Sequence, residues 1–218
     1  MEHQSDGQPG VFEDYRASTL ETATFGMGCF WGPDARFGAL PGVVRTRAGY
    51  AGGSKPDPSY YALGDHTEVL QLEYDPETID YGELLEIVWD NHNWTTQSRK
   101  RQYRGVIFAH TDAQLEAAKA SRDALEERTG RTAETDIESL EPEEFTLAED
   151  YHQKYELRST PIVGDELEAV YGKAFVDSTT VARLNGFVAG HGDLTQRREV
   201  LATVEISPMA IAELERRL

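Results

Sequence analysis

The chain contains 218 residues, and its 39 acidic against 21 basic side chains give a formal net charge of -18. This length suits one domain with a sizeable buried core, because domains usually span about 100 to 200 residues. Cys29 is the only cysteine, so a small fold held together by internal disulfides is excluded. The chain has no apolar run of the roughly 18 residues that a membrane-spanning helix needs, and its polar start lacks a signal-peptide core. We therefore expect a cytoplasmic protein, by default a monomer, that binds no membrane.

The negative charge argues against nucleic acid as a partner, since it repels phosphate backbones at ordinary salt concentrations. Lysine is rare among the basic residues and occurs only at positions 55, 100, 119, 154 and 173. An acid-rich, lysine-poor surface suits a halophilic chain, because concentrated salt screens the repulsion between its charges. An ordinary acidic protein has the same composition, so both interpretations stay open.

The predicted elements start after residues 1–18, which lack periodicity and are interpreted as an N-terminal arm. Residues 20–25 are predicted to form a strand, and residues 29–40 have the spacing of an amphipathic helix. Asp34 falls in the first turn of this helix, where an acid favours the positive end of the helix dipole. Cys29 therefore lies at a junction between a strand and a helix.

The pattern of one strand, one helix and one strand then repeats. Three further strands and two further helices are predicted, the strands at 42–50, 66–74 and 105–110 and the helices at 80–91 and 111–128. Asp80 is placed to cap the first of these helices. This order is that of the split β-α-β arrangement, so we predict an α+β fold with a ferredoxin-like two-layer core and one mixed sheet.

The last third of the chain is harder to interpret. Residues 132–150 carry many acids and no basic residue, which is typical of a solvated edge strand and loop, although Ile137, Leu140 and Phe145 are spaced to touch a core. Residues 158–218 are predicted to be a C-terminal extension. The extension could cover a site as a lid, dock another protein or complete the sheet, and its sequence does not decide between these roles.

Cys29 is the candidate nucleophile. A lone cysteine in a cytoplasmic protein is usually a small buried hydrophobe, but its position before a helix favours the reactive thiolate through the helix dipole and free amide groups. Phe30 and Trp31 follow it directly, and two large aromatic rings beside a polar junction can wall a small apolar pocket. Plain core packing is the alternative, and it fits Phe30 better than Trp31.

The run Gly28–Gly32, which reads GCFWG, resembles the signature of the A-type peptide methionine sulfoxide reductases. Further landmarks of that family follow in its order over about residues 20–157: Leu40–Val43, Gly49–Gly53, Pro56–Tyr60, His66–Val69, Tyr74–Pro76, Asn91–His92, Gln102–Arg104 and Ala148–Gln153. The resemblance implies a catalytic domain at 19–157 and an oxidoreductase. Its implied reaction is the thiol-dependent reduction of methionine S-sulfoxide, free or protein-bound, to methionine.

Glu68 is the candidate acid. Strand alternation places it on the same face as Leu70 and Leu72, so desolvation should raise its pKa and favour a protonated carboxyl near neutral pH. From the residues alone, a buried glutamate satisfied by a hydroxyl or an arginine is equally reasonable. The family resemblance assigns it the role of proton donor.

The same resemblance implies roles for five more residues. Cys29 attacks the sulfoxide sulfur and is left as a sulfenic acid. Tyr60 and Tyr103 match the two tyrosines that hydrogen-bond the sulfoxide oxygen in the family, and Phe30 with Trp31 holds the methyl group. No bound cofactor is implied.

Two departures from the family pattern stand out. The chain lacks the resolving cysteines that many members carry, so the reductant must be external: a thioredoxin-like protein, a glutaredoxin-like protein or a small thiol. The loop after His92, residues 93–101, is shorter than usual and supplies no acid to the site. Its basic residues 99–101 could attract an anionic reductant or lower the thiol pKa, or they could form a solvated basic spot.

Other functional classes fit less well. The six histidines have no short helical spacing of a zinc site, and the chain has no phosphate loop or dinucleotide fingerprint. A binding protein that kept the fold, recognising methionine-containing peptides without turnover, is the main alternative. A one-cysteine peroxide reductase is weaker, because the Cys29 motif lacks a threonine and arginine clamp.

A halophilic chain and an ordinary acidic chain differ in their response to salt. A halophilic chain should refold in higher yield as KCl is added, because screening relieves repulsion within a molecule of charge -18. Refolding yield and the free energy of unfolding are to be measured across a KCl series. Full stability without added salt would exclude the halophilic interpretation.

Overall fold

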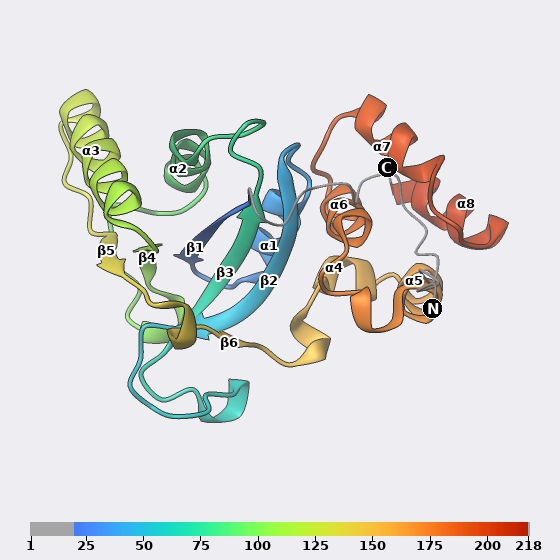
Figure 1. Cartoon of the computed structure of the whole chain (residues 1–218), viewed down its shortest axis with the longest axis horizontal. Helices are drawn as coiled ribbons and strands as arrows, with labels where there is room; N and C mark the ends of the chain where they lie inside the picture. The colour runs from blue at the N-terminus through green and yellow to red at the C-terminus, as the bar shows by residue number, and fades with distance from the viewer. Residues whose placement is uncertain (1–19, 218) are drawn as a thin grey trace, which may run out of the picture.

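The computed structural model describes residues 20–217, which form one mixed six-stranded sheet with helices around it (Figure 1). The arm predicted at 1–18 lies outside the described residues. The strands are β1 Glu21–Met27, β2 Val43–Ala51, β3 Thr67–Tyr74, β4 Gly105–Ala109, β5 Asp136–Ser139 and β6 Thr146–Leu147. Their order in the sheet is β5-β4-β1-β3-β2-β6, and only the β4–β5 pair is parallel. The central order β4-β1-β3-β2 is that of the split β-α-β arrangement, so the predicted ferredoxin-like core is confirmed.

Three helices pack on one face of the sheet: α1 Trp31–Gly38, α2 Tyr81–Asp90 and α3 Asp112–Thr129. Their apolar side chains share a core with alternate residues of β1 and β3, such as Phe25 and Leu70, because successive strand residues point to opposite faces. The predicted cap of α2 is confirmed, since the Asp80 carboxylate accepts from the Glu83 amide in a capping box. Among residues 20–217, no helix has both the length and the apolar character that crossing a membrane requires.

The other face of the sheet is covered by the acidic segment. Leu140 and Phe145 pack there against residues of β2, β3 and β4 such as Val69 and Phe108. The segment itself supplies β5, β6 and a short 3-10 helix, η3 Pro142–Glu144. The interpretation of residues 132–150 as an edge strand and loop anchored by a few apolar side chains is therefore confirmed.

The C-terminal helices gather beside β2, at the right of Figure 1. They are α4 Tyr155–Arg158, α5 Pro161–Tyr171, α6 Thr179–Val188, α7 Leu194–Leu201 and α8 Pro208–Arg217, with the 3-10 helix η5 Gly172–Ala174 between α5 and α6. They enclose an apolar core of their own that includes Leu157, Phe187 and Leu214. Residues 158–217 add no strand to the sheet. The possible role of the extension in completing the sheet is therefore wrong.

The C-terminal helices meet the sheet domain mainly where α6 crosses α1. Gly186 makes this crossing possible, because a Cβ at that position would collide with the backbone of Ala35. Arg183 of α6 reinforces it by donating to the carbonyl oxygens of Gly38 at 2.7 Å and of Val43 at 3.1 Å. The extension is therefore bound to the helix that follows Cys29.

A buried ion pair lies at this junction. The Lys154 ammonium is 3.2 Å from an Asp34 carboxylate oxygen, and both side chains have no exposed surface. Thr46 of β2 and Asn185 of α6 also donate to this carboxylate. Asp34 lies in the first turn of α1 as predicted, and it also joins α1, β2 and the C-terminal helices, because a buried charge is stable only when it is paired and hydrogen-bonded.

Removing the ammonium should destabilise the whole fold. We expect Lys154→Met to lower the free energy of unfolding by about 3–5 kcal/mol, because the Asp34 carboxylate is left buried and unpaired. Combining it with Asp34→Asn should recover part of this loss. Urea unfolding measures both, with the exposed Lys119→Met as control. A loss from Lys154→Met no larger than that of the control would contradict this interpretation.

Candidate active site

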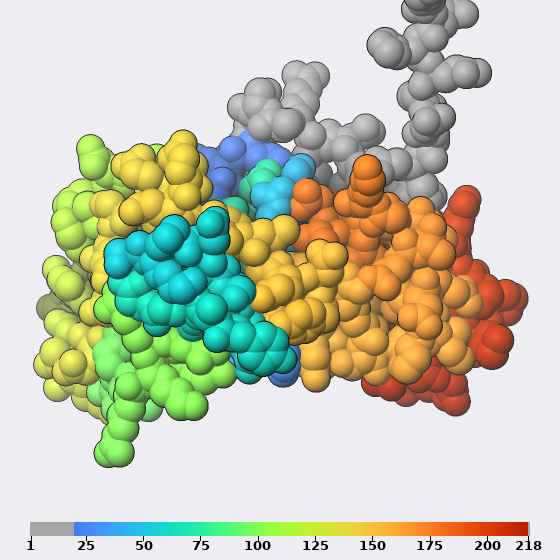
Figure 2. Space-filling view, turned by 90° about the horizontal axis from the view of Figure 1, so that it is seen from below, coloured from blue at the N-terminus to red at the C-terminus, as the bar shows by residue number. Residues whose placement is uncertain are grey.

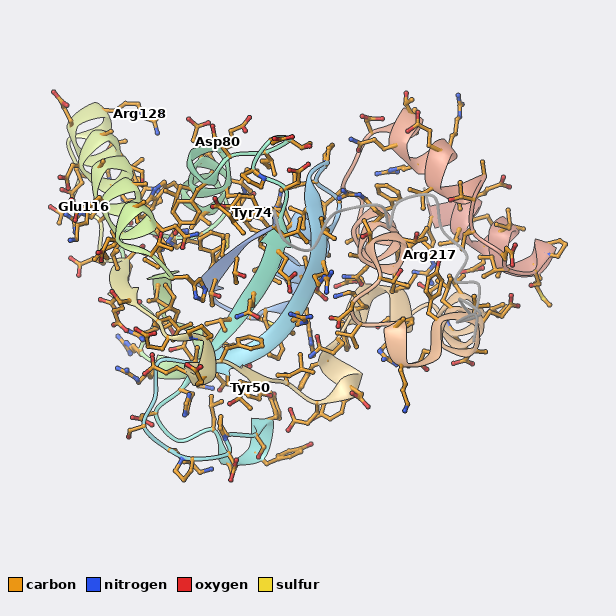
Figure 3. The ribbon with its side chains drawn as sticks, viewed as in Figure 1. Tyr50, Tyr74, Asp80, Glu116, Arg128 and Arg217 are labelled. Carbon is orange, nitrogen blue, oxygen red and sulfur yellow. The ribbon has the colours of Figure 1, made fainter. Side chains whose placement is uncertain are left out.

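The candidate site lies at one end of the central strands, where β1 and β2 end and β3 begins. Tyr50 and Glu68 are partners in the β2–β3 register, and Figure 3 shows Tyr50 at the opposite end of the central strands from Tyr74. Cys29 comes two residues after β1 and two residues before α1, whose N-cap is Phe30. Gly28 makes this sharp transition with φ 90°, a backbone conformation that favours glycine. The Cys29 side chain is exposed.

Glu68 is buried behind the start of α1, with 1% of its surface exposed. One carboxylate oxygen accepts from the Phe30 amide at 3.3 Å and the other from the Gln102 side chain at 2.6 Å. Burial raises the pKa of Glu68, and the two hydrogen bonds oppose this rise. The predicted direction of the pKa shift is confirmed. The partner Gln102 was missed, although it lies within a family landmark.

The thiol does not have the pKa that its position suggested. Partial burial of the sulfur is the largest cause that raises the pKa of Cys29 above its usual value, and a hydrogen bond from the Trp31 amide lowers it by less. The charges of Glu68 and Glu156 raise it further. The amide at the helix start thus favours the thiolate as predicted, but burial and two carboxylates outweigh it, so the net shift of the Cys29 pKa is upward.

The structure brings both predicted tyrosines to this site. Tyr103, at the end of the 3-10 helix η2 Arg101–Tyr103, lies close enough to Glu68, Tyr60 and Cys29 that each raises its pKa, after partial burial as the largest cause. The Tyr60 phenol is close enough to contribute to the raised pKa of Tyr103. Cys29, Glu68, Tyr60 and Tyr103 therefore form one cluster.

Glu149 holds the loop that carries Tyr60. It lies next to the 3-10 helix η4 Asp150–His152, and Tyr60 begins the 3-10 helix η1 Tyr60–Ala62. One carboxylate oxygen of Glu149 accepts from the Tyr60 amide at 2.9 Å and the other from the Tyr50 hydroxyl at 2.8 Å. This role was not predicted, although Glu149 lies within the landmark Ala148–Gln153, because it depends on contacts between residues 89 and 99 positions apart.

Aromatic rings wall one side of the site. Trp31 stacks on Tyr155 with ring centroids 3.6 Å apart, and its indole N–H donates to Nδ1 of His152 at 3.3 Å. Phe30 is buried against Tyr50 and lies 5.0 Å from the His152 ring. Phe30 thus belongs to the core as well as to the wall, as the alternative interpretation expected. His152 and Tyr155 were not predicted as site residues.

The short loop after His92 lies on the other side of Tyr103. A groove of about 320 Å³ there is lined in part by Gly28, Gln97 and Tyr103. Arg101 is held by the carbonyl oxygens of Asp65 and Gly52. Arg99 and Lys100 are exposed, and neither forms an ion pair with any described residue.

The histidines have structural partners. His66 accepts from the Gly53 amide and contacts the Lys55 carbonyl oxygen, so it holds the loop before η1. His92 bonds to Val88 and Thr135. Within residues 20–217, no group of three or more His, Cys, Asp or Glu side chains could hold a metal ion.

Comparisons with known proteins agree on one family. The family model described as peptide methionine sulfoxide reductase matches residues 21–174, past the predicted domain boundary at 157. A peptide methionine sulfoxide reductase of Drosophila melanogaster is 43% identical over 194 residues, which cover 87% of this chain and 77% of that one. The enzyme MsrA of Rhodospirillum centenum is 47% identical over 148 residues, covering 62% and 67%. The crystal structure of reduced Mxr1 from Saccharomyces cerevisiae has a TM-score of 0.61 at 30% identity and covers 68% of this chain and 90% of its own.

The thiol pKa can be tested by alkylation. We expect the rate of Cys29 labelling by iodoacetamide to rise with pH through a midpoint above the ordinary thiol value of about 8.5. Glu68→Gln should shift this midpoint to lower pH, because it removes a carboxylate charge that opposes the thiolate. The control is Glu116→Gln on α3, far from the site (Figure 3). A wild-type midpoint below 8.5 would show that the helix start dominates after all.

Proposed function

This chain belongs to the peptide methionine sulfoxide reductase family and is an oxidoreductase that acts on methionine sulfoxide, and on that premise we propose Cys29 as its nucleophile. The observation that carries the proposal is the grouping of an exposed thiol with a buried carboxyl and two phenols. Glu68 touches the amide of Phe30, the residue after Cys29, and Tyr103 lies near both Glu68 and Cys29. A sulfoxide bound over the Cys29 thiol would therefore have its oxygen next to the Glu68 carboxyl and the tyrosine hydroxyl groups.

Glu68 is proposed as the proton donor. Its raised pKa keeps the carboxyl protonated to a higher pH than an ordinary glutamate, so it can give a proton to the sulfoxide oxygen near neutral pH. The hydroxyl groups of Tyr60 and Tyr103 hydrogen-bond the same oxygen. As the proton moves, the thiolate formed at Cys29 attacks the sulfoxide sulfur.

The reaction then transfers oxygen to the thiol. The sulfur–oxygen bond of the substrate breaks, and Cys29 becomes a sulfenic acid while methionine leaves. A thiolate, a proton and a sulfoxide give a sulfenic acid and a thioether, so two electrons pass from the Cys29 sulfur to the substrate sulfur. Phe30 and Trp31 bind the methyl group against their rings. Each reductase type handles one epimer, and the resemblance to the A-type reductases leads us to propose the S-sulfoxide.

An external thiol completes the cycle. Cys29 is the only cysteine of the chain, so the sulfenic acid condenses with an incoming thiol to a mixed disulfide and water, and a second thiol releases Cys29. The exposed Cys29 side chain is accessible to a thioredoxin-like or glutaredoxin-like protein and to a small thiol. No prosthetic group takes part.

Turnover of a small substrate tests the proposal. Methionine S-sulfoxide with excess dithiothreitol should give methionine with the wild type and none with Cys29→Ser, at low and high salt. Glu68→Gln should slow reduction by about 10²- to 10⁴-fold, the usual contribution of a positioned acid. Glu116→Gln on α3 serves as the matched control.

Two results would overturn the proposal. Absence of methionine at every salt concentration would favour a peptide-binding protein without turnover. An unchanged rate in Glu68→Gln would remove that carboxyl from the reaction.

A further inference from the structure

Three exposed tyrosines border the candidate site, and we call Tyr60, Tyr61 and Tyr151 the aromatic rim. Their exposed fractions are 37%, 90% and 50%. Eight large hydrophobic side chains are exposed among residues 20–217, and the only three aromatic ones are these. Single exposed apolar residues are ordinary, but adjacent ones beside a pocket mark a binding surface.

The rim is continuous with the pocket that contains Cys29. The Tyr60 and Tyr61 rings meet edge to face at 5.3 Å, and Tyr60 and Tyr151 lie 4.9 and 4.1 Å from the buried His152 ring. His152 in turn bonds Trp31 of the pocket wall. Figure 2 shows the two segments that supply the rim, teal around residue 60 and yellow around residue 150, side by side at the surface.

The rim is held in place without a ligand. One oxygen of Glu149 accepts from the Tyr60 amide and so joins the segments that carry Tyr60 and Tyr151, and the other accepts from the Tyr50 hydroxyl and so anchors Glu149 to β2. Tyrosine suits such a preorganised surface, because its ring offers a large contact area with few rotatable bonds.

The reaction determines what must lie over this rim. A methionine sulfoxide sulfur held at Cys29 is separated from its own Cα by three bonds, which span less than about 5 Å. Along an extended polypeptide, each further residue adds at most about 3.6 Å to the distance from the oxidised methionine. The side chains that flank the oxidised methionine therefore pass over the border of the pocket, whereas free methionine sulfoxide has no such side chains.

From this geometry we infer that the aromatic rim binds apolar side chains that flank methionine sulfoxide in a polypeptide. Tyr61 and Tyr151 thereby determine specificity, and the preferred substrates are protein segments whose apolar residues have become exposed. The inference rests on the proposed function, since it takes Cys29 as the point where the sulfoxide is held.

Two peptides of equal length test the inference, one with leucine and phenylalanine beside the methionine sulfoxide and one with glycine and serine. Dithiothreitol is the reductant, so that docking of a reductant protein has no effect. The wild type should have a three- to tenfold higher kcat/KM for the apolar-flanked peptide, mainly through KM, as expected for about one aromatic contact. Tyr61→Ala should abolish most of this preference, and Tyr61→Phe should keep it.

Control variants separate the rim from general effects. Leu194→Ala combined with Met209→Ala removes two side chains that are each 63% exposed on the C-terminal helices, and the peptide preference should persist. A preference unchanged in Tyr61→Ala, or an equal loss on both peptides, would overturn the inference.

The rim can also be tested without catalysis. Fluorescence anisotropy measures the binding of the same two peptides to the Cys29→Ser variant. If the wild type reduces neither peptide, the proposed function fails. In that case the inference about the rim is still supported if the apolar-flanked peptide binds more tightly and if adding Tyr61→Ala removes this difference. Equal binding of both peptides would contradict the inference.

Discussion

The buried ion pair between Asp34 and Lys154 is the constraint on which the rest of the structure depends. It lies where α1, β2 and the C-terminal helices meet, and each of these elements contributes a partner to it. Cys29 lies two residues before α1, so a shift of this junction would move the thiol relative to Glu68. The C-terminal extension therefore holds α1 in place through the contacts of α6. It leaves Cys29 exposed.

The site combines two acidic groups that both hold their protons more tightly than usual. Burial is the largest cause for Glu68 and for Cys29, and the Glu68 charge further opposes ionisation of the thiol. The start of α1 alone therefore does not activate the thiol, and the proposed mechanism couples attack by Cys29 to proton transfer onto the sulfoxide oxygen.

Much of the fold could be predicted from local patterns. The strands and helices up to residue 130 all begin and end within about two residues of their predicted bounds, because alternation and helical spacing are local signals. The pairing of Lys154 with Asp34 spans 120 positions and leaves no local signal. The same limit hid Glu149 and Gln102, and it hid the sign of the Cys29 pKa shift, which depends on burial and on distant carboxylates.

A single turnover in the absence of any reductant tests the central claim most directly. Protein mixed with excess methionine S-sulfoxide should release one methionine per chain and then stop, and dimedone should label Cys29 as its sulfenic acid adduct. Release of methionine with an unmodified Cys29, or continued turnover without a thiol, would contradict the account.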